Sequence, residues 1–129
     1  MSGGVTCFPH TPYWYTCQEE IFTEIARISS GYTVYQCVEC AQAIKKWLKE
    51  NEVSGTHLQL SATGRLKFIV SNRWKGGQES IAQTGIHQEI ETQGKVFDNL
   101  APTGLERANW LSDFDCASGD IEITEIESF

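Results

Sequence analysis

The sequence predicts a single α+β domain in which helices pack on one face of an antiparallel sheet. Apolar residues recur at helical spacing in the first part of the chain and alternate with polar residues further on. The chain has 129 residues, close to the commonest domain size. It contains no repeat, linker or low-complexity tract, so we expect one domain over residues 1–129.

The first two elements are a predicted arm and a predicted helix. Residues 1–16 mix glycine, proline and aromatic side chains without a period, so we expect an irregular arm. Residues 17–28 place three isoleucines on one helical face, and Gly31 is a suitable residue to end that helix.

A second helix is predicted from about Cys37 to Asn51. Its apolar stripe consists of Cys37, Cys40, Ala41, Ile44, Trp47 and Leu48. Thr33 with Gln36 three residues later could form a capping box, which would start the helix slightly earlier. In either case Cys37 lies in or just before the first helical turn.

Beyond residue 55 the apolar period changes from 3.6 to 2, which predicts strands. Two strands are predicted over 56–62 and 66–71, joined by a short turn, and a loop follows over 72–80. Two further strands are predicted over 85–100 around a Gln93-Gly94 turn. A short helix over 104–114 and a strand over 120–129 complete the prediction.

Charge and composition restrict the partners. The formal net charge is -7, and the basic cluster of Lys45, Lys46 and Lys49 fits the solvated side of a helix, so we expect no nucleic-acid partner. No stretch approaches the roughly 18 apolar residues of a membrane span, and the start lacks the features of a secretory signal. Five cysteines do not pair off. We expect a fold and a target in the reducing cytoplasm, no membrane partner and no cofactor.

Cys37 is the candidate nucleophile. A cysteine at a helix N-terminus lies among unsatisfied N–H groups and the positive end of the helix dipole, which lowers the thiol pKa and favours the reactive thiolate. Inert packing is an equally good reading of either cysteine from helix position alone. Cys40, one turn further on, is expected to point more into the core. The candidate bases are His10 in the arm, His57 at a strand start, and His87.

His87 is favoured because of the strands around Gln93-Gly94. In a two-residue hairpin Thr92 faces Lys95 and Ile90 faces Phe97, which puts His87, Glu89 and Asp98 on one face of the sheet. His87 and Asp98 are then diagonal neighbours, within reach of a side-chain hydrogen bond that would hold the imidazole as a base. A one-residue slip would replace Asp98 by Asn99, which can also orient a histidine.

These residues resemble a known family. The stretches "QCVECAQAIKKWL" and "SIAQTGIHQEIETQGKVFDNLAPTGLERANWLSDF" look like the papain-fold toxin domains of bacterial polymorphic toxin systems, of the type common in cyanobacteria. The resemblance covers residues 31–114. It implies the fold of papain-like cysteine peptidases, in which a helix carrying the nucleophile packs on an antiparallel sheet that carries the histidine.

The resemblance implies Cys37 as nucleophile, His87 as base and Asp98 as the residue that orients it. It implies peptidase, deamidase or related acyl-transfer chemistry on a protein or peptide, through a thioester. An oxyanion-hole side chain is expected from upstream of the cysteine, and Gln36 is a candidate beside Ser29 and Ser30. Cys40 and Asn99 are further supporting candidates.

The resemblance also bears on context. Such domains usually end long exported toxins and commonly have a cognate immunity protein. We expect an excised domain, an orphan cassette or a resident enzyme. A wall of the substrate site is expected from Trp74 and the Gly76-Gly77 loop.

Three other readings remain open. Cys37 and Cys40 form a CxxC, which could serve a thiol-disulfide oxidoreductase. They could also bind zinc with Cys116, His57 or His87. A catalytically inactive interaction domain would use exposed aromatic residues, and the candidates are Tyr13, Trp14, Tyr15, Trp74 and Trp110.

Overall fold

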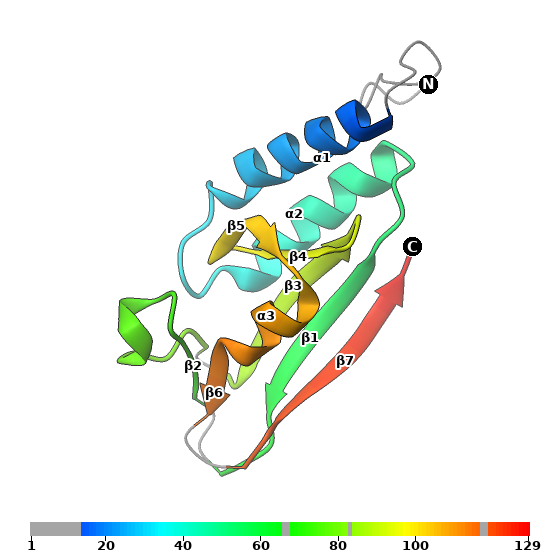
Figure 1. Ribbon diagram of the computed structural model, residues 1–129. Coiled ribbons are helices and arrows are strands. Elements are labelled where there is room, and N and C mark those ends of the chain that lie inside the picture. Colours follow the sequence, from blue (N-terminus) through cyan, green and yellow to red (C-terminus); the bar gives the residue numbers. More distant parts are fainter. Residues whose placement is uncertain (1–13, 66–67, 83, 117–118) are drawn as a thin grey trace.

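The computed structural model describes residues 14–65, 68–82, 84–116 and 119–129. Two long helices lie over one face of a five-stranded antiparallel sheet (Figure 1). A short helix and a two-stranded sheet cover the other face. The α+β class predicted from the sequence is confirmed.

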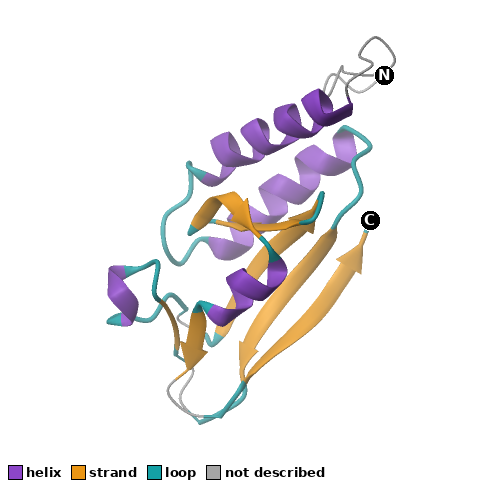
Figure 2. Ribbon diagram, in the orientation of Figure 1, coloured by secondary structure: helices purple, strands orange, loops and turns teal. Residues whose placement is uncertain are grey.

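The helices in the described part are α1 (Trp14–Ser29), α2 (Cys37–Glu50) and α3 (Arg107–Ser112), with a 3-10 turn η1 (Lys75–Gly77). The large sheet has the order β5-β4-β3-β1-β7 and consists of β1 (Thr56–Ala62), β3 (Ile86–Thr92), β4 (Lys95–Asp98), β5 (Ala101–Leu105) and β7 (Ile121–Ser128). The small sheet pairs β2 (Ile69–Ser71) with β6 (Phe114–Cys116). Figure 2 shows these elements by type.

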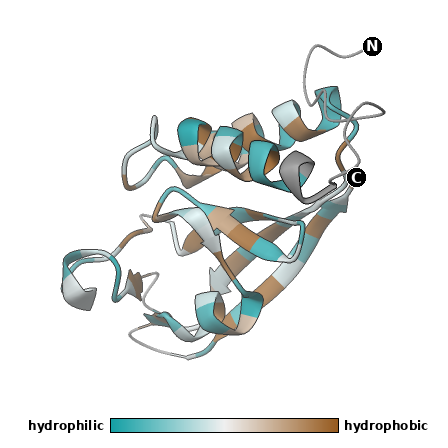
Figure 3. Ribbon diagram, turned by 45° about the horizontal axis from the view of Figure 1, so that its top comes forward, coloured by the Kyte–Doolittle hydropathy of each residue, from teal (hydrophilic) through white to brown (hydrophobic). Residues whose placement is uncertain are grey.

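The core between α1, α2 and the sheet follows from the helical periodicity. Hydrophobic and hydrophilic positions alternate around both helices (Figure 3). Ile25 of α1 and Ile44 of α2 are fully buried against Ile90 and Phe97 of the β3–β4 hairpin. No helix in the described ranges is long and apolar enough to span a membrane.

A second core fills the opposite face of the sheet. Leu60 of β1 and Val96 of β4 pack there with Trp110 of α3 and Phe114 of β6. The small sheet and α3 therefore close the face that α1 and α2 leave open. The candidate site lies beside this second core.

The helix predictions hold for α2 and need a correction for α1. α2 runs from Cys37 to Glu50, one residue short of the predicted end, and it does not start earlier at the expected capping box. α1 begins at Trp14, so residues 14–16 of the predicted arm are helical. These residues include no glycine or proline, so nothing in them prevents the helix from beginning at Trp14. Residues 1–13, with His10, lie outside the described part.

The predicted hairpin between 56–62 and 66–71 is wrong. β2 contains three residues, and it pairs with β6 rather than with β1. The reason is that β3 and β7 occupy both edges of β1, which leaves no edge for β2. Residues 66–67 lie outside the described part.

The helix predicted over 104–114 is shorter than expected. It covers only Arg107–Ser112, because residues 101–105 form the edge strand β5 and residues 114–116 form β6. Pro102 is compatible with an edge strand, where one side of the backbone has no partner. The final strand, β7, lies within the predicted range.

Gly104 of β5 provides a test of this packing. Its φ is +81°, and a Cβ built there would lie 2.6 Å from the Phe97 ring. Gly104→Ala is expected to lower the free energy of unfolding by about 2–5 kcal/mol, since left-handed strain and overpacking add. Urea denaturation measures it.

Gly94→Ala is the matched control. Gly94 has the same φ of +81°, but nothing lies within 4 Å of a Cβ there. Its cost is expected to be about 1–2 kcal/mol, from strain alone. Equal losses for the two variants would contradict the close approach of Gly104 to Phe97.

Candidate active site

The candidate site lies where the start of α2 meets the start of β3. Cys37, the first residue of α2, is 6% exposed, and its Sγ lies 4.0 Å from the carbonyl oxygen of Ile86. The backbone N–H of Gln88 also interacts with the sulfur. The thiol is therefore held against the backbone of the strand that carries His87.

The predicted register of the β3–β4 hairpin is confirmed. Thr92 pairs with Lys95 and Ile90 pairs with Phe97 across the Gln93-Gly94 turn. Because side chains alternate along a strand, His87 and Asp98 lie on the face opposite Phe97, toward the second core. The register selects Asp98 over Asn99 as the partner of His87.

His87 and Asp98 form a buried pair. The Nε2 of His87 lies 2.8 Å from Oδ2 of Asp98, and the two residues are only 1% exposed. The Nδ1 of His87 is buried and makes no hydrogen bond within the described part of the chain. The Cys37 thiol is close enough to perturb the pKa of His87, so Nδ1 is the ring nitrogen left for the sulfur.

Asp98 is supplied with donors from several elements. Its Oδ2 also accepts from Nε1 of Trp110 at 2.9 Å, and Oδ1 accepts from the N–H of Leu100 at 2.8 Å. Arg73 approaches Oδ1 at 3.5 Å. Burial alone would raise the pKa of Asp98, but His87, Arg73 and Trp110 together hold it well below its usual value. Asp98 is therefore an ionised carboxylate inside the protein.

Trp110 and Arg73 were not identified from the sequence. Trp110 was considered only as a surface aromatic, whereas it is fully buried. A buried tryptophan usually finds a partner for its N–H, which is a signal for a nearby acceptor but not for which one. Arg73 lies in a predicted loop, and nothing near it in the sequence indicates its contact with Asp98.

The pKa shifts favour an ion pair between His87 and Cys37. Burial lowers the pKa of His87, but the hydrogen bond with Asp98, the nearby Cys37 sulfur and nearby negative charge outweigh it and raise the pKa to about 10. Burial raises the pKa of Cys37, but His87 and the N–H of Gln88 outweigh it, so the net direction is downward. An imidazolium beside a thiolate is the reactive form of a cysteine nucleophile.

Cys40 differs from Cys37 in both position and pKa. It is fully buried in the first core, and burial raises its pKa to about 12, although the nearby Ser29 side chain acts in the opposite direction. Both cysteines are free thiols. A resolving cysteine attacks as a thiolate, so this environment disfavours the oxidoreductase reading.

The loop before α2 is pinned at two sites. Asn99 donates to the carbonyl of Thr33 at 2.7 Å, so Asn99 holds this loop rather than the imidazole. Tyr35 has φ of 74°, unusual for an aromatic residue, and its hydroxyl donates to the carbonyl of Ser80 at 2.9 Å. Together these contacts fix the position at which α2 begins, and therefore the position of Cys37.

Gln36 precedes Cys37 without capping the helix. Its Oε1 accepts from the N–H of Thr33 at 2.8 Å and from the Thr33 hydroxyl at 3.1 Å, which leaves Nε2 as a donor. No side chain caps the first turn of α2. The N–H groups at the start of an α-helix have no acceptor within the helix, so those beside Cys37 are available to an anion.

Glu89 lies on the same sheet face as His87 and is fully buried. Neither of its carboxyl oxygens has a hydrogen-bond partner among the described residues, and burial raises its pKa well above the usual value. Burial therefore favours the uncharged form of Glu89.

His57, the other described candidate base, belongs to a separate network. Nζ of Lys45 lies 2.9 Å from its Nδ1, and its Nε2 lies 2.8 Å from Oε1 of Gln88. Lysine only donates, so Nδ1 accepts and Nε2–H donates to Gln88. Both ring nitrogens are occupied, which leaves neither for a thiol. No cluster of three or more metal-ligating side chains occurs among the described residues.

A pocket of about 200 Å³ opens beside Cys37. It is lined by Tyr35, Cys37, Val38, Ile81, Ala82, Thr84 and Ile86. The expected wall from Trp74 and the Gly76-Gly77 loop does not border it, because Trp74 packs against the second core instead.

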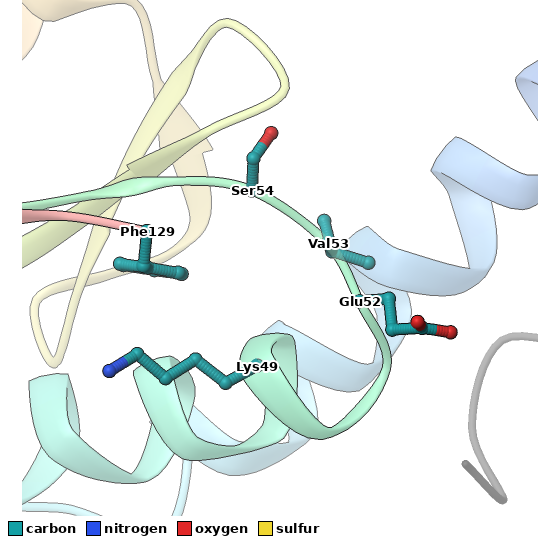
Figure 4. Close-up of a pocket in the computed structure, with 5 residues that line it drawn as sticks. All are labelled: Lys49, Glu52, Val53, Ser54 and Phe129. Carbon is teal, nitrogen blue, oxygen red and sulfur yellow. The ribbon is translucent and has the colours of Figure 1, made fainter. Parts of the chain in front are cut away.

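A second pocket, of about 280 Å³, is formed by Lys49, Glu52, Val53, Ser54 and Phe129 (Figure 4). It lies at the C-terminal end of α2, at the other end of the helix from Cys37. It is therefore separate from the candidate site.

A cysteine at a helix start, facing a histidine–aspartate pair on an antiparallel sheet, is the arrangement typical of papain-like domains. A comparison with family models agrees: the papain fold toxin 2 model matches residues 20–115. The chain belongs to the papain fold toxin 2 family. No curated protein and no solved structure is significantly similar to it.

The buried pair predicts a pH window of stability. The raised pKa of His87 contributes stability below its ordinary value of 6.5, which is lost as the pH rises toward 10. The lowered pKa of Asp98 contributes stability above 3.8, which is lost as the pH falls. Asp98→Asn is expected to cost about 3–5 kcal/mol, most between those two ordinary values.

Urea unfolding of wild type and Asp98→Asn across pH 3–10 measures this window. Glu50→Gln, at an exposed position of α2, is the control and should show a small difference with no such maximum. A difference for Asp98→Asn that does not vary with pH would show that the pair is not ionised in the folded state.

Proposed function

We propose that this domain is a cysteine hydrolase that acts on a protein or peptide through a Cys37–His87–Asp98 triad. The single observation that carries the proposal is how the two nitrogens of the His87 ring are used. Nε2 is bonded to Asp98, which leaves Nδ1 for the sulfur. Membership of a papain-fold toxin family supports the same chemistry.

The proposed reaction has two stages. The Cys37 thiolate attacks the acyl carbon of the substrate, and the His87 imidazolium gives its Nδ1 proton to the leaving amine. A thioester with Cys37 remains. Water then attacks the thioester, His87 takes the proton of that water, and the thiolate is released together with the acid. Asp98 stays ionised throughout and holds the imidazole in place.

The oxyanion of each tetrahedral intermediate is placed at the start of α2. The backbone N–H of Cys37 supplies one donor. Gln36 supplies a second donor through Nε2, because its contacts with Thr33 occupy Oε1 and leave Nε2 to donate. Asn99 and Tyr35 act as positioning residues, since each fixes the loop that carries Gln36.

Peptide hydrolysis, deamidation and acyl transfer all share the thioester and differ in the group that leaves or attacks. As a toxin domain, the protein would act on a target protein in the cytoplasm of the intoxicated cell, and an immunity protein would block Cys37. These are proposals about context, and the chemistry above does not depend on them.

The nucleophile is tested by residue-resolved alkylation. Iodoacetamide labelling followed by mass spectrometry should show Cys37 reacting as a thiolate below the ordinary thiol pKa, because His87 lowers the pKa of Cys37. His87→Ala should slow this labelling at pH 6 by roughly tenfold or more, since one pKa unit is a factor of ten in thiolate. Cys40→Ser should leave it unchanged.

Two results would count against this assignment. One is a Cys37 labelling rate that does not respond to His87→Ala. The other is a disulfide between Cys37 and Cys40 that controls the rate, which would favour the oxidoreductase instead.

The oxyanion donor is tested by comparing two reactions of the same thiol. Gln36→Ala is expected to slow acylation of Cys37 by p-nitrophenyl acetate about 10²–10³-fold, because acylation passes through an oxyanion. Alkylation by iodoacetamide forms no oxyanion, so its rate should hardly change. Gln42→Ala, at an exposed position of α2, is the control for both reactions. Equal slowing of the two reactions by Gln36→Ala would point to a misplaced Cys37.

A further inference from the structure

We infer that Glu89 is a positioning residue of the proposed reaction that acts through His87. Its carboxyl group keeps its proton in the folded protein at neutral pH and releases it to the solvent as the pH rises. The negative charge then stabilises the imidazolium of His87. The inference rests on the proposed function, in which that imidazolium is the acid that protonates the leaving amine. No step of the proposed reaction otherwise involves Glu89.

The carboxyl group of Glu89 is buried without a hydrogen-bond partner. The residue is 0% exposed, and neither carboxyl oxygen has a partner among the described residues. The residue paired with it on β1 is Leu58, which is apolar. A carboxylate in such surroundings loses its hydration without compensation, so the protonated form is favoured there.

The donors on this face of the sheet are used by Asp98 instead. The register of the β3–β4 hairpin puts Glu89 and Asp98 at neighbouring positions of the two strands, on one sheet face. Asp98 accepts hydrogen bonds from His87, from Trp110 and from a backbone N–H, whereas Glu89 accepts none from the described residues. Like charges on neighbouring strands repel each other, so the carboxyl group without donors is the one that keeps its proton.

Several titratable and charged groups act on Glu89 from the elements around it. They are Cys37 of α2, His87 of β3, Asp98 of β4 and Arg107 of α3. Arg107 is engaged elsewhere, since its guanidinium donates to both carboxyl oxygens of Glu91. Burial outweighs the attraction of His87 and Arg107 and raises the pKa of Glu89 well above its ordinary value of 4.5.

The protons of Glu89 and His87 influence each other. The charge of the imidazolium favours ionisation of Glu89, and an ionised Glu89 in turn favours the imidazolium. Glu89 therefore loses its proton first as the pH rises, and His87 keeps its proton to a higher pH than it would beside a neutral group. For the proposed reaction, this widens the pH range in which the Cys37 thiolate faces an imidazolium that can protonate the leaving amine.

Urea unfolding of wild type and Glu89→Gln across pH 4–9 tests the stored proton. Above pH 4.5 the folded wild type binds one more proton than the unfolded chain, so its stability falls as the pH rises. Glutamine has nearly the same shape and cannot ionise. The ratio of the wild-type to the variant unfolding constant is therefore expected to grow by up to about tenfold per pH unit, until Glu89 ionises in the folded protein.

Nitrogen-15 NMR of histidine-labelled protein follows His87 itself, with His87→Ala to assign its signals. Glu89→Gln is expected to lower the pH at which the imidazolium loses its proton by about one pH unit, because the variant lacks the nearby opposite charge. A glutamine that changed only the packing would leave this titration in place. Glu50→Gln, at an exposed position of α2, is the control for both measurements and should reproduce the wild type.

Two outcomes overturn the inference. One is a ratio of unfolding constants that does not change with pH, which would show that Glu89 is ionised in the folded protein. The other is a His87 titration that is the same in wild type and Glu89→Gln. The proposed function is decided separately, by the alkylation of Cys37.

Infrared spectroscopy of the wild type decides if Glu89→Gln does not fold. The carbonyl band of a protonated carboxyl group is expected at pH 7, and it should disappear at a lower pH than the one at which His87 titrates. Absence of that band at pH 7, or its persistence beyond the titration of His87, overturns the inference.

Discussion

The carboxylate of Asp98 is a buried charge beside the second core, and four segments of the chain meet around it. It accepts from β3 through His87, from α3 through Trp110, from the β4–β5 turn through Leu100, and from the loop after β2 through Arg73. A buried charge of this kind is tolerated only when it is paired and fully hydrogen-bonded. The arrangement of β2, β6 and α3 on this face of the sheet is therefore tied to the same carboxylate that orients the imidazole.

The nucleophile reaches this centre from the other core. Cys37 begins the helix that packs on the opposite face of the sheet, and its thiol meets His87 where the start of α2 lies against the start of β3. The hydrogen bond from Asn99 to Thr33 spans that junction, because Asn99 directly follows Asp98 while Thr33 precedes the helix. One turn between β4 and β5 thus controls both the carboxylate and the loop before the thiol. This coupling explains how residues from two separately packed layers come together at one site.

The parts of this structure that were predictable are those governed by short-range rules. The apolar stripe of α2 and the Gln93-Gly94 turn each fix geometry over a few residues, so the position of Cys37 and the register that brings His87 near Asp98 follow from local sequence. The pairing of β2 with β6 does not, because it depends on which edges of β1 are already taken. The contacts of Arg73 and Trp110 with Asp98 likewise depend on how distant segments pack. The pocket wall was misplaced for the same reason: no local signal distinguishes Ile81 from Trp74 as a neighbour of Cys37.

The side of the pocket lined by Ile81, Ala82, Thr84 and Ile86 contains none of the proposed reacting groups. It is attached to β2 through Ser80 and Ile69, at the margin of the small sheet, whereas the thiol, the imidazole and the carboxylate are fixed by α2 and the β3–β4 hairpin. That side of the pocket and the proposed reacting groups are thus encoded in different stretches of the gene. Descendants of such a domain could exchange the stretch between β2 and β3 without rebuilding the proposed reacting centre. That separation would allow the lining of the pocket to change while the proposed mechanism stays the same.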